Sequence, residues 1–362
     1  MAYRMIQVGT GGRGRTWCRS ILPPNVEDGL IEPVAAVDLD PDAHENAIEG
    51  LGLDPGQCYT DMEEALEAVE ADIVGNVTPP HVHEDVVEAA LAHDMDIISE
   101  KPIADTLEAS ARIVKKVEDA DAKMGVTMSH RFRDDVTTLR RQVRSGEHGP
   151  LDYLYGRYAV NARSYGWGDR LYEWDEHPLL IDGSVHHLDL LADLAGGEPE
   201  EIYAHTWNPE WSEFDGDPNA VVHLKCDDGT HVTYEGSNTN AVSTGGWGNE
   251  HVRAECRDAT LMLDGHEIAA FPYDEDGENC TGNARFSDGE AIPLDEQEKW
   301  SDPWLVEQFV EWLDGGEPME TNVEDNLVSM ALVFGAIESA ETGEPVNVGD
   351  LLAEARAEVG LD

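Results

Sequence analysis

The sequence has little positive charge. Among 362 residues, 23 lysines and arginines stand against 76 aspartates and glutamates, which gives a formal net charge of −53. No lysine or arginine occurs from Ser20 through Glu100. Because so acidic a surface repels phosphate groups, the charge excludes nucleic-acid binding and attachment to anionic membranes. Lysine is scarcer than arginine. This composition is typical of halophilic organisms that keep molar salt in the cell; an unusually acidic protein of an ordinary cell is the alternative.

Cysteines and long apolar runs are also scarce. The five cysteines are scattered and show no C-x-x-C spacing, which excludes a disulfide framework and a cysteine zinc site. No apolar run approaches the roughly 20 residues of a membrane span. The first eight residues run into a predicted strand and lack the long apolar stretch of a signal peptide, so we expect a cytoplasmic protein.

A glycine-rich motif follows the first predicted strand. Residues 6–8 run into Gly9-Thr10-Gly11-Gly12-Arg13-Gly14, and a helix is expected from about Arg15. In this strand–turn–helix context, G-x-G-x-x-G lets the backbone approach a dinucleotide pyrophosphate. A second predicted strand, at 32–37, ends at Asp38, whose carboxylate can accept hydrogen bonds from the adenosine ribose. A helix cap or turn residue is the alternative interpretation of Asp38.

Strands and helices alternate through the first third of the chain and then give way to another pattern. Strands are predicted at 73–77, 96–99 and 125–130, and helices at 62–69, 82–93 and 106–122. This alternation implies a parallel doubly wound sheet, so residues 1–129 are predicted to form an α/β Rossmann domain. Beyond a helix at 139–144, the predicted strands are 151–160, 201–207, 220–226, 231–237, 251–257 and 259–263, and two helices at 303–313 and 323–341 close the chain. We expect residues 130–362 to form an α+β domain on a large, mostly antiparallel open sheet.

Two further places carry chemistry. Lys101, in Glu100-Lys101-Pro102, is the first cation after the long acidic stretch, and at the carboxyl edge of a parallel sheet it would face the ligand crevice. A surface lysine is the alternative on position alone. Asp182 and His186 are four residues apart at the start of a helix predicted from Ser184, so the carboxylate could reach toward the imidazole and orient it. A helix cap and a packed polar residue are the structural alternative.

Four motifs occur in order along the chain. They are the glycine motif, Thr78-Pro79-Pro80-His81-Val82-His83, Glu100-Lys101-Pro102, and Asp182-Gly183-Ser184-Val185-His186-His187-Leu188-Asp189. Together they resemble the Gfo/Idh/MocA family of nicotinamide-dependent sugar and inositol oxidoreductases, over nearly the whole chain. The family's usual D-x-G-x-H has its glycine two residues after the aspartate, whereas here Ser184 takes that place. This replacement of glycine by Ser184 changes the expected local backbone geometry. The ionisable residues of the pattern are all present.

The resemblance implies hydride transfer between a CH–OH group of a sugar, polyol or inositol and NAD, or alternatively NADP. His186 would take the hydroxyl proton, Lys101 would bind the hydroxyl oxygen, and Asp182 would orient the site. The implied cofactor residues are Gly9, Thr10, Gly11, Gly12, Arg13, Gly14, Asp38, Thr78, Pro79, His83, Glu100 and Lys101. The substrate candidates are Arg131, Tyr165, Trp167 and His187. Arg131 could instead lock the two domains together, and the aromatic side chains could instead fill an interface.

Other functions and partners stay open at this point. A redox-neutral glycoside hydrolase of the same superfamily, which keeps its NAD bound, and a non-catalytic dinucleotide-binding sensor are the alternatives. A sensor needs neither Lys101 nor His186. No metal is expected, because the histidine pairs 81/83 and 186/187 lack a cysteine cluster and neighbouring helix residues point about 100° apart. The resemblance implies a homodimer or homotetramer packed through the sheet of the second domain.

The charge predicts folding that depends on salt. Since a net charge of −53 must be screened, we expect the midpoint of thermal unfolding to rise between dilute buffer and molar KCl. Scanning calorimetry across a KCl series measures this, and a constant midpoint would contradict the halophilic interpretation.

Overall fold

The computed structural model describes residues 2–163, 177–275 and 284–361, which form two compact units. The first unit comprises Met1–Ser129, Lys299–Met330 and Glu354–Asp362, and the second comprises His130–Glu298 and Ala331–Ala353. The sequence analysis predicts domains at residues 1–129 and 130–362. The two late segments of the first unit had been assigned to the second domain.

The first unit is built on a six-stranded sheet. Its strands are β1 (Tyr3–Val8), β2 (Ile31–Val37), β3 (Cys58–Tyr59), β4 (Ile73–Asn76), β5 (Asp96–Ser99) and β6 (Met124–Val126), all parallel, in the order β3-β2-β1-β4-β5-β6. The strand order reverses between β1 and β4, and ligands of doubly wound sheets bind outside the carboxyl ends of the strands at such a point. The predicted Rossmann domain is confirmed.

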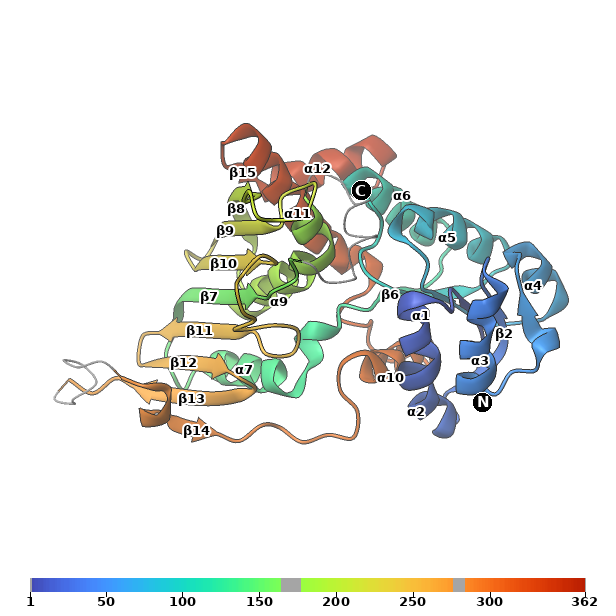
Figure 1. The fold of residues 1–362 in the computed structure, drawn as a ribbon, viewed down its shortest axis with the longest axis horizontal. Coiled ribbons are helices and arrows are strands. Elements are labelled where there is room, and N and C mark those ends of the chain that lie inside the picture. The colour runs from blue at the N-terminus through green and yellow to red at the C-terminus, as the bar shows by residue number, and fades with distance from the viewer. Residues whose placement is uncertain (1, 164–176, 276–283, 362) are drawn as a thin grey trace. The chain divides into compact units, whose positions relative to one another are not determined.

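Helices connect these strands (Figure 1). They are α1 (Gly12–Thr16), the π-helix Trp17–Ile21, α2 (Leu22–Glu27), α3 (His44–Leu51), α4 (Met62–Ala68), α5 (His83–Ala92) and α6 (Leu107–Asp119). The sequence explains α6 well. The Thr106 side chain accepts a hydrogen bond from the backbone N–H of Ala109 and caps the helix, while Leu107, Ile113 and Val117 face the core.

The late segments complete the first unit through hydrogen bonds that the sequence pattern does not reveal. Thr321 accepts from the backbone N–H of Val126 at the end of β6 (2.9 Å) and donates its hydroxyl to the Val126 carbonyl (2.6 Å). Helix α10 (Ser301–Leu313) lies against α2, where the Asn25 side chain donates to the Pro303 carbonyl at 2.9 Å. These contacts are why the two segments belong with the Rossmann sheet.

The second unit contains a nine-stranded sheet. Its strands are β7 (Leu151–Ala159), β8 (Pro199–Trp207), β9 (Asn219–Cys226), β10 (His231–Ser237), β11 (His251–Cys256), β12 (Ala259–Asp264), β13 (Glu267–Pro272), β14 (Glu290–Ile292) and β15 (Val346–Asn347). The order is β14-β13-β12-β11-β7-β10-β9-β8-β15, and among the described strands of this sheet only the β7–β10 pair is parallel. The mostly antiparallel sheet is therefore confirmed; β13, β14 and β15 were not predicted.

One face of this sheet is buried. Leu154 pairs with Val232 on β10 and with Ala254 on β11, and all three side chains point to the same side and are shielded from solvent. Helices α7 (Asp134–Arg144) and α9 (Val185–Ala195) lie on the sheet, as Figure 1 shows. The opposite face carries half-buried polar and aromatic side chains such as Tyr155 and Glu235. Period-two burial of this kind is expected of a sheet with one covered face.

The chain closes with α11 (Val323–Thr342) and α12 (Val348–Val359). The sequence analysis predicted α11 and missed α12. In the part of the chain that the structure describes, we find no helix with the length and apolar character that crossing a membrane requires.

Candidate active site

The glycine motif follows β1, next to the carboxyl end of the neighbouring strand β4. Gly9 has φ of +84°, and a Cβ there would lie 2.3 Å from the carbonyl oxygen of Val77 at the end of β4. A Cβ on Gly14 would lie 2.2 Å from the carbonyl oxygen of Gly9. Both positions therefore require glycine, the first for its backbone conformation and close packing, the second for packing alone. The helical stretch begins at Gly12, earlier than predicted.

Asp38 braces this turn. One carboxylate oxygen accepts hydrogen bonds from the backbone N–H groups of Thr10 (2.7 Å) and Gly11 (2.9 Å), and the other accepts from the N–H of Asp40 (3.0 Å). Burial acts to raise the pKa of the Asp38 carboxyl, but the hydrogen bonds from Thr10, Asp40 and Gly11 hold the pKa below its usual value. A carboxylate fixed at the end of β2 beside a glycine turn fits the adenosine half of a dinucleotide.

Arg13 points into an ionic cluster. Its Nε donates to Glu100 at 2.6 Å, and its guanidinium binds Asp302 of α10 at 2.9 Å. The same Glu100 oxygen accepts from the indole N–H of Trp17 at 2.7 Å. Burial raises the pKa of the Asp302 carboxyl, while Arg13 acts in the opposite direction. Glu100 and Arg13, predicted to bind the cofactor, are thus engaged in anchoring the first helix.

His83 is fully buried and joins two turns. Its Nε2 lies 2.8 Å from the Thr78 carbonyl oxygen, and its Nδ1 lies 3.0 Å from that of Pro102. Burial lowers the pKa of His83 below its usual value, with the carbonyl contacts acting against it. The ring of His83 thus holds the Thr78-Pro79 turn next to the turn that carries Lys101, and its predicted place near the cofactor stays a prediction. Lys101 itself is half-buried and follows β5, at the carboxyl edge of the sheet.

In the second unit, Asp182 lies inside the π-helix Leu179–Ser184, which continues into α9. The predicted helix start at Ser184 is therefore wrong, because the helical turn already includes Asp182. Asp182 borders a hollow of about 220 Å³, together with the aromatic residues Tyr158 and Trp247. Asn161, Asn238 and Ser243 contribute amide and hydroxyl groups to the same wall.

His186 belongs to a cluster of stacked rings. Its imidazole lies parallel to that of His130, with ring centroids 4.1 Å apart and planes 10° apart. Trp247 stands at right angles to both of these rings. The neighbouring His187 stacks on Trp247 at 5.6 Å and contacts Tyr158 at 4.7 Å. The imidazole of His186 is therefore packed against the rings of His130 and Trp247.

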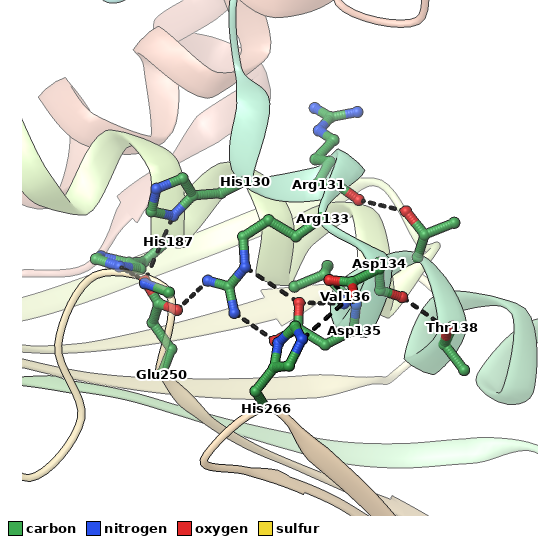
Figure 2. Close-up of polar contacts among 12 residues, drawn as sticks. His130, Arg131, Arg133, Asp134, Asp135, Val136, Thr138, His187, Glu250 and His266 are labelled. Atoms are coloured by element: carbon green, nitrogen blue, oxygen red, sulfur yellow. Dashed lines mark hydrogen bonds and ion pairs between the residues drawn. The ribbon is translucent and has the colours of Figure 1, made fainter. Parts of the chain in front are cut away.

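Glu250 supplies negative charge beneath these rings. Its carboxylate pairs with the guanidinium of Arg133 and faces His187 Nε2 at 3.4 Å and His130 Nδ1 at 3.5 Å (Figure 2). Burial acts to raise the pKa of the Glu250 carboxyl, but the contacts with His187 and Arg133 lower it far below its usual range. The lowered pKa keeps the Glu250 carboxyl ionised at neutral pH.

The four predicted substrate residues lie in different surroundings. Arg131 forms a bidentate pair with the buried Asp189, at 2.5 Å for each of two contacts. Its guanidinium therefore neutralises a buried carboxylate of the second unit, and the predicted substrate contact or domain lock stays a prediction. Tyr165 and Trp167 lie outside the described residues. His187 is nearly fully buried, packed among the rings.

The sequence analysis missed His130, Trp247 and Glu250. The available signals were a tryptophan within Gly245-Gly246-Trp247-Gly248 and a carboxylate two residues beyond it. The structure brings Asp182, His186 and His187 together with these residues in the second unit. Lys101 and the cofactor residues belong to the first unit.

The strand order, the glycine turn and the Asp38 carboxylate define a dinucleotide-binding domain joined to a mixed-sheet domain. Residues 4–128 match the oxidoreductase family with an NAD-binding Rossmann fold, and residues 136–259 match the Gfo/Idh/MocA C-terminal domain. The chain belongs to the Gfo/Idh/MocA family of oxidoreductases, and its first unit is an NAD-binding domain.

Similar proteins support this assignment. The uncharacterized protein y4oX of Sinorhizobium fredii is 44% identical over 366 residues and is covered, like this chain, over its full length. An inositol 2-dehydrogenase of Corynebacterium glutamicum is 31% identical over 159 residues, which span 44% of this chain and 45% of that protein. An oxidoreductase of Agrobacterium radiobacter, solved with NAD+, L-tartaric acid and magnesium, has a TM-score of 0.81 at 20% identity, covering 97% of this chain and all of that one.

The Arg13 cluster predicts a stability effect. Replacing Arg13 with alanine leaves the buried carboxylates of Glu100 and Asp302 without their shared cation, so we expect a loss of about 2 kcal/mol in the free energy of unfolding. This is below the cost for a fully buried pair because Arg13 is 44% exposed. Urea unfolding in molar KCl measures the loss. The matched control is Arg19→Ala, whose exposed pair with Glu49 is worth less than about 1 kcal/mol; equal losses in both variants would contradict the prediction.

Proposed function

We propose that the protein transfers a hydride between a CH–OH group of a sugar, polyol or inositol-type substrate and NAD(P). The observation that carries the proposal is the hollow beside Asp182. Its wall combines two aromatic rings, Tyr158 and Trp247, with the amide and hydroxyl groups of Asn161, Asn238 and Ser243. Aromatic faces pack against the C–H groups of a sugar ring, and the polar groups can bind its hydroxyls. The similarity to the inositol 2-dehydrogenase of Corynebacterium glutamicum supports the same substrate class.

In this proposal the bound nicotinamide supplies the hydride acceptor. His186 takes the proton of the substrate hydroxyl, and its stacking on His130 keeps the imidazole in a fixed orientation. Lys101 binds the hydroxyl oxygen and stabilises negative charge that develops there as the C–H bond breaks. Asp182 orients the site from the π-helix. Asp38 and the glycine turn bind the adenosine ribose and the pyrophosphate.

A panel of polyols, inositols and aldoses, assayed in molar KCl for reduced cofactor, tests the proposal. We expect stoichiometric NADH with at least one substrate of the panel. Turnover of a glycoside without released NADH would favour the redox-neutral hydrolase instead. Binding of dinucleotide with no turnover at all would favour the sensor. The half-exposed outer face of the second sheet supports the expectation of a homodimer or homotetramer.

The assignment of roles predicts the effect of two substitutions. Lys101→Ala and His186→Ala should each lower kcat by on the order of a hundredfold, because each removes a group that stabilises the transition state. Steady-state assays and circular dichroism measure activity and folding side by side. Lys115→Ala and His205→Ala, at surface positions outside the site, serve as matched controls and should retain wild-type kcat. A folded Lys101 or His186 variant with wild-type turnover would remove the mechanism.

The residues at the glycine turn predict a preference for NAD over NADP. The Asp38 carboxylate repels a 2′-phosphate, and Arg13, the cation nearest in sequence to the turn, is held by Glu100 and Asp302. We expect kcat/KM to favour NAD by about tenfold or more at equal salt, equivalent to about 1.4 kcal/mol. If NADP is the better cofactor, the assignment of Arg13 to the ionic cluster is wrong. In that case Arg13→Ala should lower kcat/KM for NADP selectively.

A further inference from the structure

Three groups that commonly bind transition metals converge in the second unit. His130 lies in the 3₁₀ turn Ser129–Phe132, His187 on α9, and Glu250 directly before β11. One ligand atom of each lies within 4.8 Å of the others. In Figure 2 both imidazoles lie next to the Glu250 carboxylate. All three side chains are largely buried, with exposed fractions of 13%, 3% and 4%.

The separations suit a shared ion, although the contact between His187 Nε2 and Glu250 is also a long hydrogen bond when that nitrogen carries the proton. The same oxygen of Glu250 lies 3.4 Å from His187 Nε2 and 3.5 Å from His130 Nδ1. Ordinary N–H···O bonds are about 2.9–3.0 Å long. A tetrahedral ion with ligand bonds of about 2.0–2.1 Å separates its ligand atoms by roughly 3.3–3.4 Å. Both distances therefore match edges of such a tetrahedron.

The surrounding groups orient two of the ligands. His187 Nδ1 lies 3.0 Å from the Tyr234 hydroxyl, so an Nδ1–H that donates there leaves Nε2 with its lone pair toward the cluster. Ser184 donates its hydroxyl to Tyr234 at 3.1 Å. Ser184 is the residue that stands where the D-x-G-x-H pattern has glycine, so this departure adds a hydrogen bond behind His187. On the other side, Arg133 holds the second oxygen of Glu250.

We propose that His130, His187 and Glu250 bind one divalent transition-metal ion of the zinc type, with water as the fourth ligand. Two imidazole nitrogens and one carboxylate oxygen favour Zn²⁺ over Mg²⁺ or Ca²⁺, which prefer all-oxygen sites. Three protein ligands leave one coordination position for water. The sequence expectation of no metal rested on pairs of neighbouring histidines. This set takes a single residue of the 186/187 pair and adds two that are distant in sequence.

Arg133 is the main electrostatic objection to this site. Its guanidinium lies next to Glu250 and would repel a cation in the cluster. Asp135, which is fully buried, pairs with the same guanidinium and balances its charge. Glu250 then remains as the uncompensated negative charge that faces the two neutral imidazoles.

The second cluster of potential ligands provides the matched control. Asp134, Asp135 and His266 also lie within 4.8 Å of one another. The two nitrogens of the His266 ring face different carboxylates, at 3.3 Å to Asp134 and 3.1 Å to Asp135. Because both nitrogens of one ring cannot bind one ion, this imidazole bridges the carboxylates instead of chelating (Figure 2).

The experiment measures metal binding by the full chain, independently of oxidoreductase activity. The protein is stripped with a chelator and titrated with Zn²⁺ against a chromophoric chelator in molar KCl, which suppresses loose binding to the acidic surface. We expect one site per chain. Glu250→Gln and His187→Gln should each weaken binding at least tenfold, and His266→Gln should bind as the wild type does. Circular dichroism checks the folding of each variant.

Co²⁺ binding to the unaltered chain gives a second readout that does not depend on any variant. We expect the visible spectrum of a four-coordinate nitrogen–oxygen site, without thiolate charge transfer. A chain that binds no stoichiometric Zn²⁺ or Co²⁺ in molar salt would overturn the proposal. So would wild-type affinity in a folded Glu250→Gln variant, or a weakened site in His266→Gln alone.

Discussion

The packing of Gly9 against the Val77 carbonyl governs the ligand-binding edge of the first unit. A Cβ at position 9 would lie 2.3 Å from that oxygen, so β1 and β4 can end side by side only if residue 9 has no side chain. Gly14 repeats the constraint one turn later, against the carbonyl of Gly9. With the turn closed in this way, Asp38 can hydrogen-bond its backbone. The conformation of the glycine turn therefore depends on these two close backbone contacts.

Scarcity of cations shapes both units. The buried carboxylates Glu100, Asp189 and Glu250 are each paired with an arginine. An unpaired carboxylate in such surroundings would cost several kcal/mol, whereas a carboxylate at the surface of a salt-rich solution costs little. Three arginines therefore neutralise buried carboxylates, while others, such as Arg141 and Arg257, form exposed pairs. Arg13 and Arg131, for which the sequence predicts ligand contacts, both take part in such pairs.

The candidate site could be predicted in part. Short-range motifs predict Lys101, Asp182 and His186 as site residues, because each lies in a local pattern whose chemistry can be recognised without the fold. His130 and Glu250 lie 56 and 64 residues from His186. They join it only because a 3₁₀ turn, a helix and a strand of one sheet meet there. The spacing of residues along the chain does not show which distant segments are close together in space.

The sequence by itself determined the fold class, most element positions and the glycine turn, because hydrophobic periodicity and glycine conformation are local properties. It did not determine that Lys299–Met330 joins the first unit, since that depends on a bridge from Thr321 to Val126 across 195 residues. Nor did it determine the roles of His83 and Arg131. The motif supplies the ionisable group, but the partner that occupies its nitrogens, a backbone carbonyl or a buried carboxylate, is chosen by tertiary packing alone.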